Sequence, residues 1–159
     1  MGRRIEASAV VPMGREETWD LLEGDQMRRA VELSDAIVAI EDYRMRPDGT
    51  PRYVHVGKIG PAKMRFTADY SVFEPPRRTQ ATILDSPLGG AYRVDYEEVP
   101  DGTRVTHRWE VEPQNVFFGL LLPVVRPLIE RSLRQDLETI ARRASRLSVA
   151  PSQAETGPT

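Results

Sequence analysis

A long amphipathic helix near the C-terminal end is the feature that most constrains the fold of this chain. Apolar residues recur over residues 127–147 with spacings of four, four, three and four, at Ile129, Leu133, Leu137, Ile140 and Ala144. This spacing predicts one continuous apolar stripe on a helix about 31 Å long. The opposite side carries charged residues in acid-first pairs four apart, which favour the helix. Because most of the chain before the helix has strand-like patterns, the stripe is expected to pack against a sheet.

The segment before this helix, residues 116–125, is nearly all apolar. Pro123 and Pro127 predict a bent segment, with the regular helix beginning near Pro127. The run is shorter than the roughly 20 residues that cross a bilayer. We interpret it as a buried bend at one end of the core. The alternatives are a flexible lip over a cavity, or a surface that makes transient membrane contact through Phe117 and Phe118.

The first part of the chain predicts a strand followed by two short helices. Residues 4–11 alternate loosely and end at Pro12. Residues 14–22 form the first expected helix, in which Trp19 faces the core, and residues 25–32 form the second.

Six further strands follow, each separated from the next by turn residues. The clearest alternation places Met64, Phe66, Ala68, Tyr70 and Val72 on one face of a single strand. The Gly89-Gly90 pair is read as part of a turn. The expected strands span residues 36–46, 52–59, 62–73, 78–84, 91–99 and 103–111.

These elements predict an α+β fold with seven strands in one antiparallel sheet, because short turns join neighbouring strands. One helix is about 10 Å wide, whereas seven strands span about 34 Å. A flat sheet of this width would stay uncovered. The sheet is therefore expected to curve around the C-terminal helix, and space can remain between them.

The composition of the 159 residues narrows the function classes. A single domain over residues 1–147 is expected, followed by a disordered polar tail over residues 148–159. The net charge of −2 argues against a nucleic-acid-binding role. The chain has no cysteine and two histidines, so we expect no metal and no cofactor. The opening residues lack the apolar core of a signal peptide, which favours a cytoplasmic location.

Three segments resemble a known superfamily. VPMGREETWDLLEG, DGTRVTHRWEVEP and SLRQDLETIARRA are similar to motifs of the START-like, or SRPBCC, proteins of the polyketide cyclase/dehydrase-like branch. The resemblance covers about residues 5–147. It implies a helix-grip fold with a deep cavity for a hydrophobic small molecule or lipid. Some relatives are enzymes and others are carriers, and the shared motifs are structural, so they transfer no catalytic residue.

His107 is the most informative candidate for chemistry. It alternates with Val105 and Trp109 and is therefore expected to face the interior. A neutral imidazole there could hydrogen-bond a ligand carbonyl or act as an acid or base. The alternative is a structural histidine satisfied by a neighbouring tyrosine or by the backbone. His107 is thus the one catalytic candidate.

The predicted ligand-binding set combines this histidine with inward aromatic and aliphatic residues. Tyrosines suit a mainly apolar pocket because each offers a large ring and one polar tip. The set is Phe66, Tyr70, Tyr96, His107, Trp109, Ile129 and Leu133, with Tyr92 as a weaker candidate.

For two polar residues, the alternation does not decide whether the side chain faces the interior. The valines on either side of His55 compete for the inside, so we interpret His55 as structural or solvent-facing. Glu41 is buried only if Tyr43 points inward, and the opposite phase with Ile40 inward fits equally well.

Three functions remain open. The first and favoured one is a binding or carrier protein for a hydrophobic molecule. The second is a cyclase or dehydratase that uses His107 with a tyrosine as an acid–base pair on a polyketide-like or aromatic substrate. The third is an interaction protein with a filled core that docks through residues 116–125. The size and lining of the cavity distinguish them.

Overall fold

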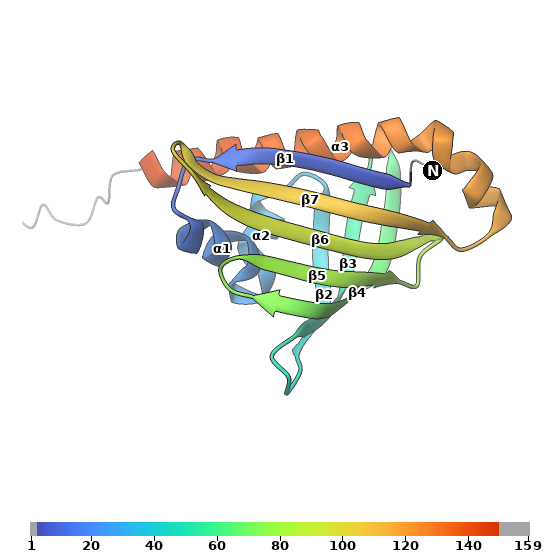
Figure 1. Ribbon diagram of the computed structural model, residues 1–159, viewed down its shortest axis with the longest axis horizontal. Helices are drawn as coiled ribbons and strands as arrows, with labels where there is room; N and C mark the ends of the chain where they lie inside the picture. Colours follow the sequence, from blue (N-terminus) through green and yellow to red (C-terminus); the bar gives the residue numbers. More distant parts are fainter. Residues whose placement is uncertain (1–2, 150–159) are drawn as a thin grey trace, which may run out of the picture.

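The computed structural model describes residues 3–149 of the chain (Figure 1). Seven antiparallel strands form one sheet in the order β1-β7-β6-β5-β4-β3-β2. The strands are β1 (Arg4–Val11), β2 (Ile37–Met45), β3 (Pro51–Ile59), β4 (Ala62–Glu74), β5 (Arg78–Leu84), β6 (Leu88–Val99) and β7 (Gly102–Pro113). The helices are α1 (Arg15–Glu23), the short 3₁₀ turn η1 (Asp25–Met27), α2 (Arg28–Leu33) and α3 (Val116–Val149).

The sheet curves strongly around the long C-terminal helix. Figure 1 shows β3 and β4 running steeply across the direction of β1 and β7, while α3 lies along β1. Helices α1 and α2 lie at the end of the sheet opposite to the start of α3. The predicted seven-stranded helix-grip arrangement is confirmed.

Helix α3 begins eleven residues earlier than the sequence pattern predicts. It starts at Val116, where the side-chain oxygen of Asn115 accepts a hydrogen bond from the backbone N–H of Phe118 at 3.0 Å. Pro123 and Pro127 lie inside the helix and are both exposed. Each removes one helical hydrogen bond on the solvent side, where water can satisfy the freed carbonyl, so the helix bends without ending. Figure 1 shows the bend near the start of α3.

The outer face of this bent segment is exposed, so the interpretation as a fully buried bend is wrong. Leu122 is buried, but Phe117, Leu120 and Val124 face solvent. At its other end the helix continues through Ser148 and Val149, where the sequence pattern predicts the start of a disordered tail. The rest of that predicted tail, residues 150–159, lies outside the described residues.

A local irregularity shifts the predicted inward pattern of β4. On β4 the alternation holds as far as Tyr70, but the register with β5 slips there and Ser71 has no partner. After this bulge Phe73, and not Val72, packs against the ring of Trp19, with ring centroids 5.1 Å apart.

Strand β6 includes the Gly89-Gly90 pair that the sequence suggests as a turn. Gly90 has φ +113°, and a Cβ there would lie 1.9 Å from the carbonyl oxygen of Glu110 on β7. Only glycine therefore lets the ladder between β6 and β7 pass through this position.

The buried side chains form clusters that surround the space under the sheet. One cluster joins the end of α3 to α1 and includes Trp19, Tyr96 and Ile140. A second lies under the first half of α3 and includes Trp109 and Ile129. A third lies under β3 to β5, around Tyr53, Ala68, Tyr70 and Ala81. Within residues 3–149, no helix is long and apolar enough to span a membrane.

Candidate functional site

A cavity of about 180 Å³ lies between the curved sheet and α3. Its walls are mainly apolar and aromatic, which is typical of small-molecule sites. Six residues of the predicted ligand-binding set line it, each from the inward phase of its own element: Phe66, Tyr70, His107, Trp109, Ile129 and Leu133. The sequence pattern therefore brings together side chains from β4, β7 and α3 that the structure also places around one space.

Tyr96, the seventh residue of the predicted set, is not among the residues that line the cavity. It is buried, and its ring packs against Trp19 with centroids 5.1 Å apart. Its hydroxyl donates a 2.7 Å hydrogen bond to Oε1 of Glu23. Tyr96 thus supports a carboxylate that itself reaches the cavity.

His107 is paired with a tyrosine on the neighbouring strand. Its Nδ1 and the hydroxyl of Tyr92 hydrogen-bond each other at 2.5 Å. Burial lowers the pKa of His107 to about 4, so the imidazole is neutral at pH 7. Burial also raises the pKa of Tyr92 above its ordinary value. The pair can offer a fixed hydrogen bond to a ligand, but neither group exchanges its proton readily near neutral pH.

His55 lines the cavity, so the solvent-facing interpretation of this residue is wrong, whereas the structural interpretation stays open. Its ring stacks on that of Phe66, with centroids 4.5 Å apart and planes 9° apart. Burial lowers the pKa of His55 to about 4, which also makes this imidazole neutral. The cavity wall therefore carries two uncharged histidines.

Glu41 has no place in the cavity. It is exposed on the outer side of β2, where Arg65 pairs with it at 2.6 Å. Two register shifts interrupt β2, between Ile37 and Ala39 and between Glu41 and Arg44. Neither of the two alternating phases considered for β2 is therefore correct. The inward residues are instead three apart, at Ile37, Ile40 and Tyr43.

Glu23 is a cavity residue that the sequence analysis does not identify. It ends α1 and is only 7% exposed. Burial raises its pKa to about 7, opposed by the hydrogen bond from Tyr96. The signal is present in the helical spacing, because Glu23 follows Trp19 by four residues and so shares its inward face. The general expectation that glutamates are exposed hides it.

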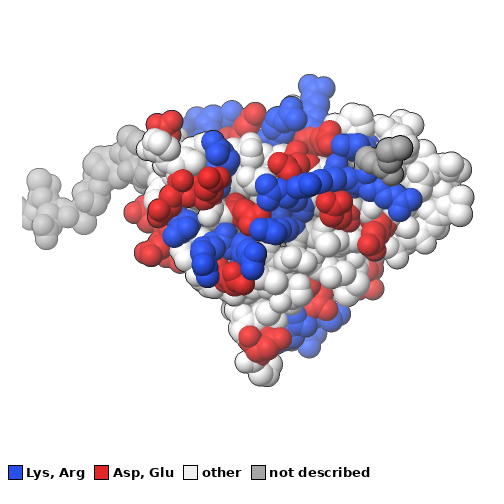
Figure 2. All heavy atoms as spheres, viewed as in Figure 1, with Lys and Arg blue, Asp and Glu red and all other residues white. Residues whose placement is uncertain are grey.

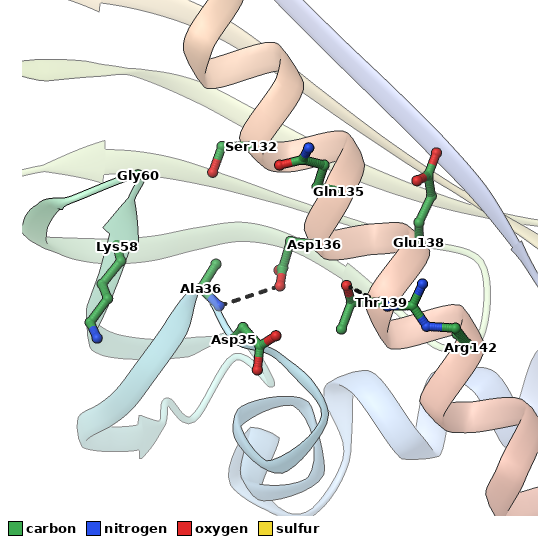
Figure 3. Close-up of a pocket in the computed structure, with 10 residues that line it drawn as sticks. All are labelled: Asp35, Ala36, Lys58, Gly60, Ser132, Gln135, Asp136, Glu138, Thr139 and Arg142. Atoms are coloured by element: carbon green, nitrogen blue, oxygen red, sulfur yellow. Dashed lines mark hydrogen bonds between the residues drawn. The ribbon is translucent and has the colours of Figure 1, made fainter.

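A polar hollow of about 410 Å³ adjoins the cavity between α3 and the start of β2 (Figure 3). Ala36, Lys58, Ser132 and Asp136 line both spaces. Oδ1 of Asp136 accepts hydrogen bonds from the Ser34 hydroxyl at 2.7 Å and from the backbone N–H of Ala36 at 3.4 Å. Burial raises the pKa of Asp136, although these two hydrogen bonds oppose the shift. We interpret this hollow as the mouth of the cavity.

No group of three or more potential metal-ligating side chains occurs in the part of the chain that the structure describes.

A curved antiparallel sheet that grips a long C-terminal helix over an apolar cavity defines the START-like class of proteins. Residues 3–145 match the family described as polyketide cyclase/dehydrase and lipid transport, and the chain belongs to this family. The match covers the sheet and most of α3. It agrees with the superfamily that the three sequence segments resemble.

Solved structures with the same fold span almost the whole chain. TTHA0849 from Thermus thermophilus has 18% identity and a TM-score of 0.76, covering 91% of this chain and 99% of its own. The Zhui aromatase/cyclase from Streptomyces has 13% identity and a TM-score of 0.74, covering 94% and 97%. A START superfamily protein from Mycobacterium smegmatis has 14% identity and a TM-score of 0.69, covering 91% and 98%. These likenesses establish the fold. No curated protein matches the chain significantly.

Proposed function

We propose that this protein binds and shields a hydrophobic small molecule or lipid in the cavity between the sheet and α3. The observation that carries the proposal is the cavity itself, which is enclosed by apolar and aromatic side chains from strands and helices. Most of the affinity would come from apolar burial, while His107 and the tyrosines fix the orientation of the ligand. The family description, which includes lipid transport, supports this function. A cytoplasmic location is part of the proposal.

Native mass spectrometry of the protein purified from its own host tests this function. A co-purifying hydrophobic molecule that is lost after delipidation and rebinds with unit stoichiometry is the expected result. Protein that is ligand-free from its host and that binds no apolar probe in titrations would contradict the proposal. Cell fractionation would test the location independently.

A cyclase or dehydratase is the second candidate, because one specific observation favours it. The hydrogen-bonded pair of His107 and Tyr92 faces the cavity, and a structural neighbour is named an aromatase/cyclase. Against this function, burial moves the pKa of both groups away from neutral pH. An acid–base catalyst works best with a pKa near the working pH. The pair therefore suits orientation of a ligand better than proton transfer.

The substitution His107→Asn separates the two candidates. In the binding function it should weaken ligand affinity by roughly tenfold, as expected for one hydrogen bond. In the enzymatic function it should remove about 10²–10⁴-fold of turnover while binding survives. The measurement is ligand titration of both proteins, together with mass analysis of the ligand before and after incubation. A ligand that the wild type converts and the variant leaves intact would reverse our preference.

We also propose that the start of α3 makes a transient contact with a membrane surface. Phe117, Leu120 and Val124 are 63%, 75% and 70% exposed and lie on one side of the helix. The end of the molecule where α3 begins is largely uncharged in Figure 2. Arg131 and Arg134 continue this helix face and make no ion pair within residues 3–149, so they suit anionic headgroups.

Cosedimentation with vesicles tests this contact. The wild type should bind anionic vesicles more strongly than zwitterionic ones, and Leu120→Asp should remove most of the binding. The matched control is Leu84→Asp, which places the same charge on an exposed leucine of β5. Equal binding of both variants would rule out the contact through α3.

A further inference from the structure

Glu23 is a buried carboxylate without a cationic partner in the structure. Its side chain is more than nine-tenths buried and lines the cavity. No lysine or arginine pairs with it within the described residues, although the other side of the sheet carries many ion pairs. Its one hydrogen bond comes from the hydroxyl of Tyr96. A buried charge with so little compensation is strongly unfavourable, which makes a partner supplied from the cavity effective.

The surroundings of Glu23 are rich in tyrosine. Burial raises the pKa of all five tyrosines of the chain, and the negative charge of Glu23 raises each of them further. The five side chains come from β2, β3, β4 and β6, and the hydroxyl of Tyr96 contacts Glu23 directly. Three of them, Tyr53, Tyr70 and Tyr92, line the cavity beside Glu23.

These tyrosine rings form a packed aromatic wall. Tyr43 stacks on Tyr53 with centroids 5.9 Å apart, and Tyr53 meets Tyr70 at 5.6 Å. The hydroxyls of Tyr53 and Tyr70 hydrogen-bond each other at 2.8 Å. The hydroxyls of Tyr53 and Tyr70 thus satisfy each other, and both side chains line the cavity. Faces of aromatic rings attract cations, most strongly where water is excluded.

A carboxylate and an aromatic wall in one apolar space match a particular ligand chemistry. An anionic ligand would meet the repulsion of Glu23 at short range. A neutral ligand would give the carboxylate no cationic partner, so Glu23 would stay uncompensated or take up a proton. A protonated amine would pair with the carboxylate by a charge-assisted hydrogen bond and lie against the tyrosine rings.

We propose that the ligand is a hydrophobic organic amine, bound with its cationic nitrogen beside Glu23 and its apolar body among Phe66, Trp109 and Ile129. This inference rests on the proposed binding function and adds the charge class of the ligand. Asp136, at the mouth of the cavity, is a second acidic group on the entry path. Asp136 already accepts two hydrogen bonds on Oδ1, from Ser34 and Ala36, whereas Glu23 accepts one, so the cation site is assigned to Glu23.

Three probes that share one naphthyl body test the inference: naphthylmethylamine, naphthylmethanol and naphthoate. Their affinities for the full-length protein would be measured by calorimetry at about pH 8, where the amine is protonated and Glu23 is ionised. The wild type should bind the amine roughly tenfold or more tightly than the alcohol, and the carboxylate most weakly. Glu23→Gln should bind the amine and the alcohol within about threefold of each other.

The control variant is Glu17→Gln, which makes the same chemical change at an exposed position of α1. It should keep the wild-type preference for the amine. Binding of the alcohol reports whether the cavity of each variant is intact. The comparison of the three probes in the wild type tests the inference even if a variant fails to fold. Equal binding of the amine and the alcohol by the wild type would overturn the inference while the binding function stands. Failure of all three probes to bind the wild type would overturn both.

Discussion

At the scale of single residues, Glu23 both lines the cavity and destabilises the fold when it is ionised. The folded protein holds the proton of Glu23 more tightly than the unfolded chain does, because burial raises the pKa from 4.5 to about 7. The stability that this proton confers is fully present below about pH 4.5 and is lost as the pH rises through about 7. The difference is on the order of 3 kcal/mol. The proposed binding group thus lowers the stability of the fold above about pH 7, as is common at functional sites.

Glu23→Gln should therefore stabilise the protein at pH 8 and change little at pH 4.5. Glutamine is uncharged, and its side-chain oxygen can still accept the hydrogen bond from Tyr96. We expect a gain of up to about 3 kcal/mol at the higher pH. Urea denaturation at both pH values measures it. Equal stability of the two proteins at pH 8 would show that the charge of Glu23 is compensated by the fold.

The contrast between His107 and Glu23 shows which site residues a sequence can reveal. His107 lies in a strand, where strict alternation with Val105 and Trp109 is enough to define the direction of its side chain. Glu23 lies at the end of a short helix with other acids nearby, so its spacing from Trp19 gives a weaker signal. Its burial also depends on Tyr96, 73 residues away along the chain. No local pattern encodes such a contact.

At the scale of elements, α3 changes its role along its length. Its first turns expose apolar side chains. Its later turns bury Leu137, and they pack Ile140 and Ala144 against the sheet and α1. The apolar stripe predicts this second half correctly. The prolines mislead the prediction of the first half, because a helix can pass through exposed prolines when water satisfies the freed carbonyls.

Leucines at two positions of α3 should differ sharply in their effect on stability. Leu137 is 3% exposed and Leu128 is 61% exposed. Leu137→Ala should destabilise the protein by about 2–5 kcal/mol, since it leaves a cavity in the core. Leu128→Ala should change the free energy of unfolding by less than about 0.5 kcal/mol. Chemical denaturation of both variants is the measurement, and similar losses would mean that the bent segment is packed against another surface.

The strands also show which features of the fold the sequence can and cannot predict. The residue ranges of β1 and β5 are predicted without error, because alternation and turn residues are local signals. The bulges on β2 and β4 are not predicted, since they depend on the register between strands. These bulges decide that Phe73 and Ile40 point inward. The sequence therefore predicts that the sheet curves around α3, but it does not predict where β2 and β4 are bulged.

At the scale of the whole molecule, the cavity exists because the curved sheet encloses more space than one helix fills. Trp109 and Phe66 both line that space but differ in how deeply they are buried. Trp109 is buried, and its indole N–H donates a 3.0 Å hydrogen bond to the carbonyl of Gly89. Phe66 is only partly buried, lines the cavity and stacks on the ring of His55.

Truncation at these two positions should therefore have unequal effects. Trp109→Ala should destabilise the protein by about 3–5 kcal/mol, the range for a packed aromatic residue that also loses a hydrogen bond. Phe66→Ala should destabilise it by less than about 3 kcal/mol, because part of its ring already faces empty space and loses fewer contacts. The same substitution enlarges the cavity and should improve the binding of a bulkier apolar probe. Chemical denaturation and calorimetric titration measure the two effects. Suppose that Phe66→Ala destabilises the protein as much as Trp109→Ala and does not improve the affinity for the bulkier probe. This wall would then belong to a filled core.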